Sequence, residues 1–117
     1  RLDPSKLNEL AELADGNLEF VADLLETYLD DALPRTQNLV EALAHGDHSS
    51  AAALAHALKS GSANVGATTI AEHFGQIEEA GRLGNMDTIQ STLDLWYKDF
   101  EDTVSAIKTW LAEHPTG

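Results

Sequence analysis

The sequence predicts an all-α fold, an antiparallel up-down four-helix bundle with a short additional N-terminal helix. Apolar residues recur every three or four positions along most of the chain, which is the period of a helix with one buried face. Short segments rich in Gly, Asp and Asn separate these stretches, and short connections favour antiparallel neighbours. No stretch alternates apolar and polar residues in the way that a half-buried strand does.

The first two predicted helices differ in length. Asp3 followed by Pro4 is typical of a helix start, and it predicts a short helix that ends near residues 15–16. Helical spacing of apolar residues then extends over 17–45 and predicts a long helix. Pro34 lies inside this second stretch and removes one backbone hydrogen bond. Because nothing around Pro34 resembles a turn, we expect one kinked helix, with two shorter helices as the alternative.

The next two helices have recognisable start and stop signals. Asp47 is expected to cap a helix that runs to about Asn64. Gly66 then stands where a left-handed terminator is needed. Thr68 or Thr69 is predicted to cap the fourth helix, which ends in a glycine-containing turn.

The last predicted helix begins at an Asp87 cap and is long. Its apolar residues step by four, three, four, four, three and four: Ile89, Leu93, Trp96, Phe100, Val104, Ile107 and Leu111. This heptad-like stripe predicts near-antiparallel packing in a bundle.

Composition indicates one globular domain over residues 1–117. The chain has 117 residues, of which 43% are hydrophobic, so it can bury a core. The absence of cysteine excludes disulfides, thiolate metal sites and cysteine nucleophiles. A net charge of −13 argues against nucleic acid and membrane as partners. No apolar run approaches the roughly 18 residues of a membrane span, and a start at Arg1 leads us to expect a piece of a longer protein.

The helix that follows Asp47 carries the candidate reactive residue, His56. At about 100° per residue, an apolar stripe gathers on the side opposite His56: Leu54, Leu58, Gly61 and Val65. Small side chains surround the imidazole: Ser49, Ala52, Ala53, Ser60 and Ala63. Lys59 lies beside it, and no acid occurs between Asp47 and Glu72. We therefore expect an exposed imidazole on a flat surface suited to docking of another protein.

The chemistry of this surface follows from the residue types. A neutral imidazole can act as a nucleophile or a general base. Lys59 can pair with a phosphoryl oxygen, and an acid-free surface suits a group that carries about −1.5 to −2 charge. The alternative is an ordinary surface histidine on an Ala-rich packing helix.

Residues 56–67, His-Ala-Leu-Lys-Ser-Gly-Ser-Ala-Asn-Val-Gly-Ala, resemble the signature of histidine-containing phosphotransfer (HPt) domains, roughly H-x-L-K-G-S-S-x-x-[LV]-G-A. Three further segments lie where this family has similar residues: Leu33-Pro34, Gly46-Asp47 and Ile77-Glu78. The resemblance spans nearly the whole chain. Ser60 and Gly61 stand in exchanged order relative to the family, which predicts preserved activity with an altered partner preference.

The resemblance implies a phosphorelay intermediate. His56 would accept a phosphoryl group at Nε2 from a receiver-domain aspartate and pass it to another. Lys59 would stabilise the added charge, and Glu78 would orient the Nδ1 side of the ring. The resemblance implies no cofactor and no metal site in this chain, since the receiver domain supplies Mg²⁺. With no ATP site of its own, the domain would not phosphorylate itself.

The same resemblance implies partners and a setting. The partners are response-regulator receiver domains, which would dock on Ala52, Ala53, Ser60 and Ala63, while Gly61 and Gly66 are structural. We expect a cytoplasmic monomer, either free-standing or the cytoplasmic C-terminal domain of a hybrid sensor kinase.

Two rival functions remain. One is a non-catalytic interaction module, a degenerate HPt domain that still binds receivers. The other is the dimerisation helix pair of a sensor kinase, which is disfavoured because Ala57 rather than an acid follows His56.

The other histidines are given structural roles. Three of them lie at helix ends or in turns and are expected to be solvated: His45, His48 and His114. His73 falls between two inward-facing isoleucines and is expected to be partly buried packing. No spacing among these histidines and the neighbouring Glu72 matches a closed zinc site.

Overall fold

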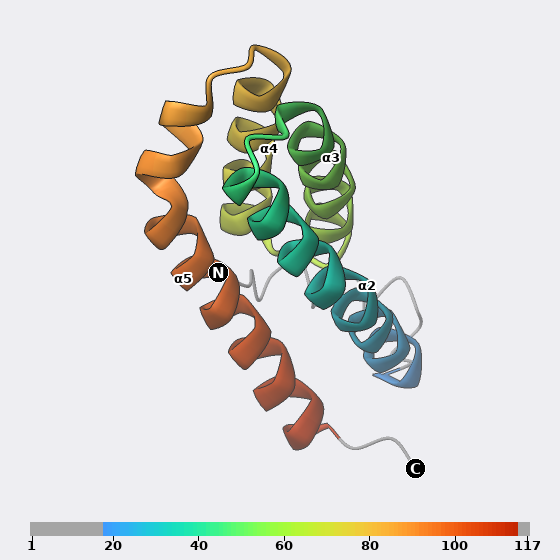
Figure 1. The fold of residues 1–117 in the computed structure, drawn as a ribbon. Coiled ribbons are helices and arrows are strands. Elements are labelled where there is room, and N and C mark those ends of the chain that lie inside the picture. Colours follow the sequence, from blue (N-terminus) through green and yellow to red (C-terminus); the bar gives the residue numbers. More distant parts are fainter. Residues whose placement is uncertain (1–17, 115–117) are drawn as a thin grey trace.

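The computed structural model describes residues 18–114, and in this part of the chain it consists of α-helices with no strand. The helices are α2 (Leu18–Ala44), α3 (His48–Asn64), α4 (Thr68–Arg82) and α5 (Met86–Glu113). They pack as a ring in which α2 contacts α3, α3 contacts α4, α4 contacts α5, and α5 returns to α2 (Figure 1). The predicted helical bundle is confirmed, while the short N-terminal helix predicted before residue 17 lies outside the described residues. None of the described helices is long and apolar enough to cross a membrane.

Helix α2 is one continuous helix across Pro34, so the alternative of two shorter helices is wrong. Pro34 is exposed, and buried residues such as Leu29 and Leu39 lie on either side of it. Because both halves of α2 bury side chains in the same core, packing offsets the hydrogen bond that proline cannot make.

Two of the predicted helix starts are displaced. Ala67 is the N-cap of α4 and has no side-chain cap, so neither Thr68 nor Thr69 caps the helix. Asn85 rather than Asp87 caps α5, and its side chain accepts a hydrogen bond from the Thr88 backbone N–H at 3.4 Å. The left-handed turn at Gly84 ends directly before Asn85, which leaves Asp87 in the first turn of α5, where a carboxylate still favours the helix dipole.

The start and end of α3 agree with the prediction. The Asp47 side chain accepts a hydrogen bond from the Ser50 backbone N–H at 3.1 Å and caps the helix. Gly66 has a φ of 78°, a left-handed conformation that a side chain would strain. The helix that carries His56 is therefore fixed at both ends by local chemistry.

The α5 stripe faces the core as predicted. Its most deeply buried members are Ile89, Trp96, Phe100 and Ile107, and the others are partly buried. Phe74 of α4 lies against the rings of Trp96 and Phe100, with centroid distances of 5.7 and 6.2 Å. These aromatic contacts hold α4 on α5.

The buried side of α3 is rotated from the predicted stripe. Leu54 and Gly61 are only partly buried, whereas the fully buried residues include Ala51, Ala55 and Ser62. The rotation arises because α3 packs between α2 and α4 and buries a face toward each.

A hydrogen bond of 2.7 Å joins Ser62 Oγ to the Tyr28 hydroxyl of α2 inside the core. Burial raises the pKa of the Tyr28 hydroxyl, and the hydrogen bond to Ser62 opposes that rise. The contact fixes α2 against α3 nearly two turns beyond the site histidine.

Candidate functional site

His56 projects from the middle of α3 with 62% of its side chain exposed, as the sequence predicted. Its Nδ1 lies 2.9 Å from Oε2 of Glu78, which projects from α4. A carboxylate can only accept a hydrogen bond, so Nδ1 carries the proton and donates it. The lone pair is therefore on Nε2, on the side of the ring that faces away from Glu78.

Glu78 is a buried carboxylate, with 7% of its side chain exposed. Three groups bind it: the His56 imidazole, the Arg82 guanidinium at Oε2, and the Lys59 ammonium, whose Nζ lies 3.9 Å from Oε1. An ionised carboxylate is costly to bury unless it is paired and hydrogen-bonded. The three partners meet this requirement and hold Glu78 in one position beneath the imidazole.

Two cations and one anion therefore surround the imidazole. Helix α3 itself has no acid near His56, but α4 places Glu78 beside the imidazole. Lys59 and Arg82 outnumber that single carboxylate and are both well exposed. This balance leaves positive charge beside the exposed imidazole.

Sequence reasoning missed Arg82. The signal was present, because Arg82 follows Glu78 by four residues, a spacing that places the two side chains on adjacent turns of one helix. The glycine opposite Lys59 was also missed. A Cβ on Gly75 would lie 3.5 Å from Lys59 Cδ and 3.6 Å from Cε, so the lysine stem crosses the α4 backbone at this glycine.

Of the small residues predicted to form a docking surface, only some are exposed. Ala53, Ser60 and Ala63 are exposed around His56, but Ala52 is buried, with 8% of its surface accessible. Ala52 packs against Gly81 of α4, where an added Cβ would lie only 3.1 Å from the Ala52 Cβ. The expectation that Ala52 is exposed is wrong, because the helical wheel of α3 alone could not show how close α4 comes.

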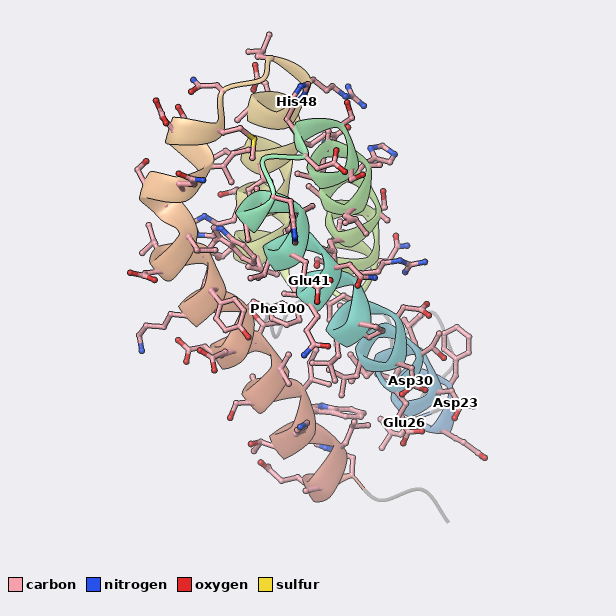
Figure 2. The ribbon with its side chains drawn as sticks, in the orientation of Figure 1. Asp23, Glu26, Asp30, Glu41, His48 and Phe100 are labelled. Atoms are coloured by element: carbon pink, nitrogen blue, oxygen red, sulfur yellow. The ribbon has the colours of Figure 1, made fainter. Side chains whose placement is uncertain are left out.

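A shallow depression extends from His56 toward the start of α3, lined by His48, Ser49, Ala52, Ala53, His56, Gly81 and Arg82. His48, labelled at the upper end of α3 in Figure 2, donates a hydrogen bond from Nδ1 to the Gly81 carbonyl at 3.1 Å. His48 is exposed, as predicted, and this hydrogen bond also ties it to α4.

The two residues in exchanged order, Ser60 and Gly61, point to different sides of α3. Ser60 is exposed near His56, whereas Gly61 faces the Tyr28 ring of α2, where a Cβ would make an ordinary contact at 3.6 Å. A side chain would therefore fit at position 61. At position 66, by contrast, the positive φ of the backbone favours glycine.

The remaining histidines pair within the fold. His73 is partly buried as predicted, and its Nε2 lies 3.3 Å from Asp99 Oδ2 of α5. His114 stacks on the Trp110 ring at 4.2 Å and is partly buried, which corrects the prediction that it is solvated. Across residues 18–114 no three metal-binding side chains lie close enough to hold a metal ion.

Comparison with known proteins agrees with this geometry. Residues 23–111 match the family model of the Hpt domain. The crystal structure of histidine-containing phosphotransfer protein B (HptB) from Pseudomonas aeruginosa PAO1 is similar to the whole bundle, with a TM-score of 0.84 and 26% sequence identity over 97% of this chain and 96% of that chain. No curated protein sequence matches the chain.

Proposed function

The chain belongs to the Hpt domain family, and from this premise we propose that His56 is its phosphoacceptor. Hpt domains are phosphocarriers without an ATP site, so the chain has a role in a phosphotransfer relay of two-component signalling. In our proposal, His56 accepts a phosphoryl group from the aspartate of one receiver domain and passes it to the aspartate of another. The observation that carries this assignment is the exposed imidazole whose Nδ1 donates to a buried carboxylate.

The transfer step uses the lone pair of Nε2. Nε2 attacks the phosphorus of the receiver's aspartyl phosphate, the N–P bond forms, and the P–O bond to the aspartate breaks with its electron pair on the leaving carboxylate. The ring becomes positively charged while Nδ1 keeps its proton. Glu78 stabilises that charge through the hydrogen bond at 2.9 Å. Transfer of the phosphoryl group from His56 to the aspartate of a second receiver follows the same steps in reverse.

Two exposed cations offset the charge of the transferred group. A phosphoryl group brings about −1.5 to −2 charge and three acceptor oxygens. Lys59 lies one turn from His56 on a flexible stem, and its Nζ is held only loosely, 3.9 Å from Glu78. We propose that Lys59 turns from Glu78 to the phosphoryl oxygens, while Arg82 stays paired with Glu78 and keeps the carboxylate in place.

The receiver domain completes the reaction centre. In our proposal the receiver binds the Mg²⁺ that phosphoryl transfer requires. The exposed small residues Ala53, Ser60 and Ala63 leave room for a partner backbone to approach the imidazole. This chain would thus supply a nucleophile in a fixed orientation, and the receiver the other catalytic groups.

The test is transfer from a phosphorylated receiver in the presence of Mg²⁺, followed as acid-labile, base-stable label on the chain. We expect label on the wild type and none on His56→Gln, because glutamine has no nucleophilic ring nitrogen. Lys59→Ala should slow the transfer while its far-UV circular dichroism stays that of the wild type. Label that persists in His56→Gln would refute the assignment, and failure of transfer from several receivers that bind the chain would indicate a non-catalytic interaction module.

A further inference from the structure

The seam between α2 and α5 lies on the other side of the bundle from the α3–α4 seam that holds His56 (Figure 1). Two hollows follow one another along it. One lies between Val40 of α2 and Leu93 of α5, and the next between Leu33 of α2 and Val104 of α5. Tyr97 lines both hollows, so they form one continuous depression, which we call the α2–α5 groove.

Apolar side chains from both helices line the α2–α5 groove, with polar and charged side chains between them. Leu33 is 42% exposed and Tyr97 is 38% exposed, although both are large hydrophobic residues. Between them, Phe100 forms a buried floor. On α5 the groove runs from Leu93 to Lys108, which at about 1.5 Å per residue corresponds to about four helical turns. That length and a boundary of two antiparallel helices suit a third helix as the occupant.

Acids outnumber bases in and beside the groove. Glu41 lines the groove, and three further exposed acids lie toward the start of α2 on the helical stripe of Leu33 and Gln37: Asp23, Glu26 and Asp30. Figure 2 shows these four acids along α2, with Phe100 across the seam on α5. Asp94 and Glu101 add two acids from α5, against which the lining has the lysines Lys98 and Lys108. The charge therefore favours a cationic occupant.

We propose that the α2–α5 groove binds a cationic amphipathic helix of a partner protein. Its apolar side chains would lie over Leu33 and Tyr97, and its Lys and Arg residues would face the acids of α2. A second copy of the chain fits less well, because it would bring the same acidic rims together in a protein of net charge −13. Since the groove lies away from the α3–α4 seam, such a partner and a receiver domain could bind at the same time.

The test uses a synthetic amphipathic helix of leucine and lysine, about four turns long, and a matched helix of leucine and glutamate. Fluorescence anisotropy of the labelled peptides gives affinity, and amide chemical shifts of the chain give location. We expect saturable binding of the lysine peptide, with shifts along α2 and α5, and no binding of the glutamate peptide.

Matched variants separate the groove from general attraction to an acidic protein. Leu33→Ser should weaken lysine-peptide binding about tenfold, whereas Leu95→Ser, which changes a residue of α5 that is 64% exposed and outside the groove, should leave it unchanged. Glu41→Gln with Glu101→Gln should weaken binding about fivefold, and Glu72→Gln with Glu79→Gln should have little effect. The two double charge variants still test the proposed site if Leu33→Ser folds poorly.

Three results would overturn the proposal. Equal weakening by both charge pairs would mean that net charge alone attracts the peptide. Shifts confined to the surface around His56 would place the binding elsewhere. Self-association in sedimentation that Leu33→Ser abolishes would identify a second copy of the chain as the occupant. His56→Gln should not change the peptide affinity, so this test is independent of the phosphotransfer assignment.

Discussion

At the α3–α4 seam the helices meet through Ala52 and Gly81, whereas the α2–α5 seam is lined by Leu33, Val104 and Tyr97. Small residues let the α3 and α4 backbones approach closely, so that the Glu78 side chain reaches across to His56. Between α2 and α5 lie larger side chains, and a groove remains there. The size of the seam residues thus decides whether a helix pair can fix a polar contact or presents an apolar surface.

The charges of the two seams differ in the same way. Glu78 is buried and has three partners, so its position is determined by contact. The acids along the α2–α5 groove, such as Glu41 and Glu101, are exposed and act over longer distances through solvent. Mutations at the first seam should therefore change reaction geometry, and mutations at the second should change only association.

The largest effect that would sharpen this comparison is expected at Glu78. Glu78→Ala removes the acceptor of the Nδ1 proton and the partner of Lys59 and Arg82, so the phosphotransfer rate should fall about 10- to 100-fold. Glu78→Gln keeps an acceptor oxygen without the charge and should give an intermediate rate. Single-turnover transfer from a phosphorylated receiver measures both. Glu79→Ala, at an exposed neighbour, is the control, and a wild-type rate in Glu78→Ala would show that the contact is not used.

The next effect concerns the close packing of the α3–α4 seam. Gly81→Ala would place a Cβ 3.0 Å from the His48 carbonyl and 3.1 Å from Ala52, so it should lower the free energy of unfolding by about 1–3 kcal/mol. Gly75→Ala makes only ordinary contacts with Lys59, and alanine favours a helix, so it should raise stability by up to about 1 kcal/mol. Urea denaturation compares the two variants. Equal effects would mean that the seam is looser at Gly81 than the structure shows.

The smallest effect is expected at Asp47, whose charge is exposed like those of the groove but hydrogen-bonded like that of Glu78. Hydrogen bonds from the Ser50 side chain and backbone hold the pKa of Asp47 below its ordinary value of 3.8. A lowered pKa means that the carboxylate stabilises the fold above pH 3.8 and that this contribution is lost as the pH falls through the lowered pKa.

Asp47→Asn tests this sign. The asparagine still caps α3 but does not titrate, so the melting temperatures of wild type and variant should differ most above pH 3.8 and converge in stronger acid. A difference that grows as the pH falls would contradict the assigned direction.

Much of the fold could be predicted because its signals are local. The apolar stripe from Ile89 to Leu111 and the turn at Gly66 depend on residues within a few positions of each other. The displaced caps show the limit of such signals. Thr68 and Asp87 are good capping residues, but the preceding glycine-containing turns end one or two residues earlier and set where each helix begins.

By itself, the sequence determined the number and order of the helices over the described residues and the exposure of His56 on α3, since helical periodicity encodes which face is apolar. Only the tertiary structure showed that Glu78, which the family resemblance had suggested, contacts that imidazole, and which surface stays open. Glu78 and Arg82 arrive from α4, and Ala52 is buried because Gly81 lets α4 approach. The α2–α5 groove likewise exists only between helices. Contacts of this kind depend on how closely and at what rotation two helices pack, which no single helical stretch contains.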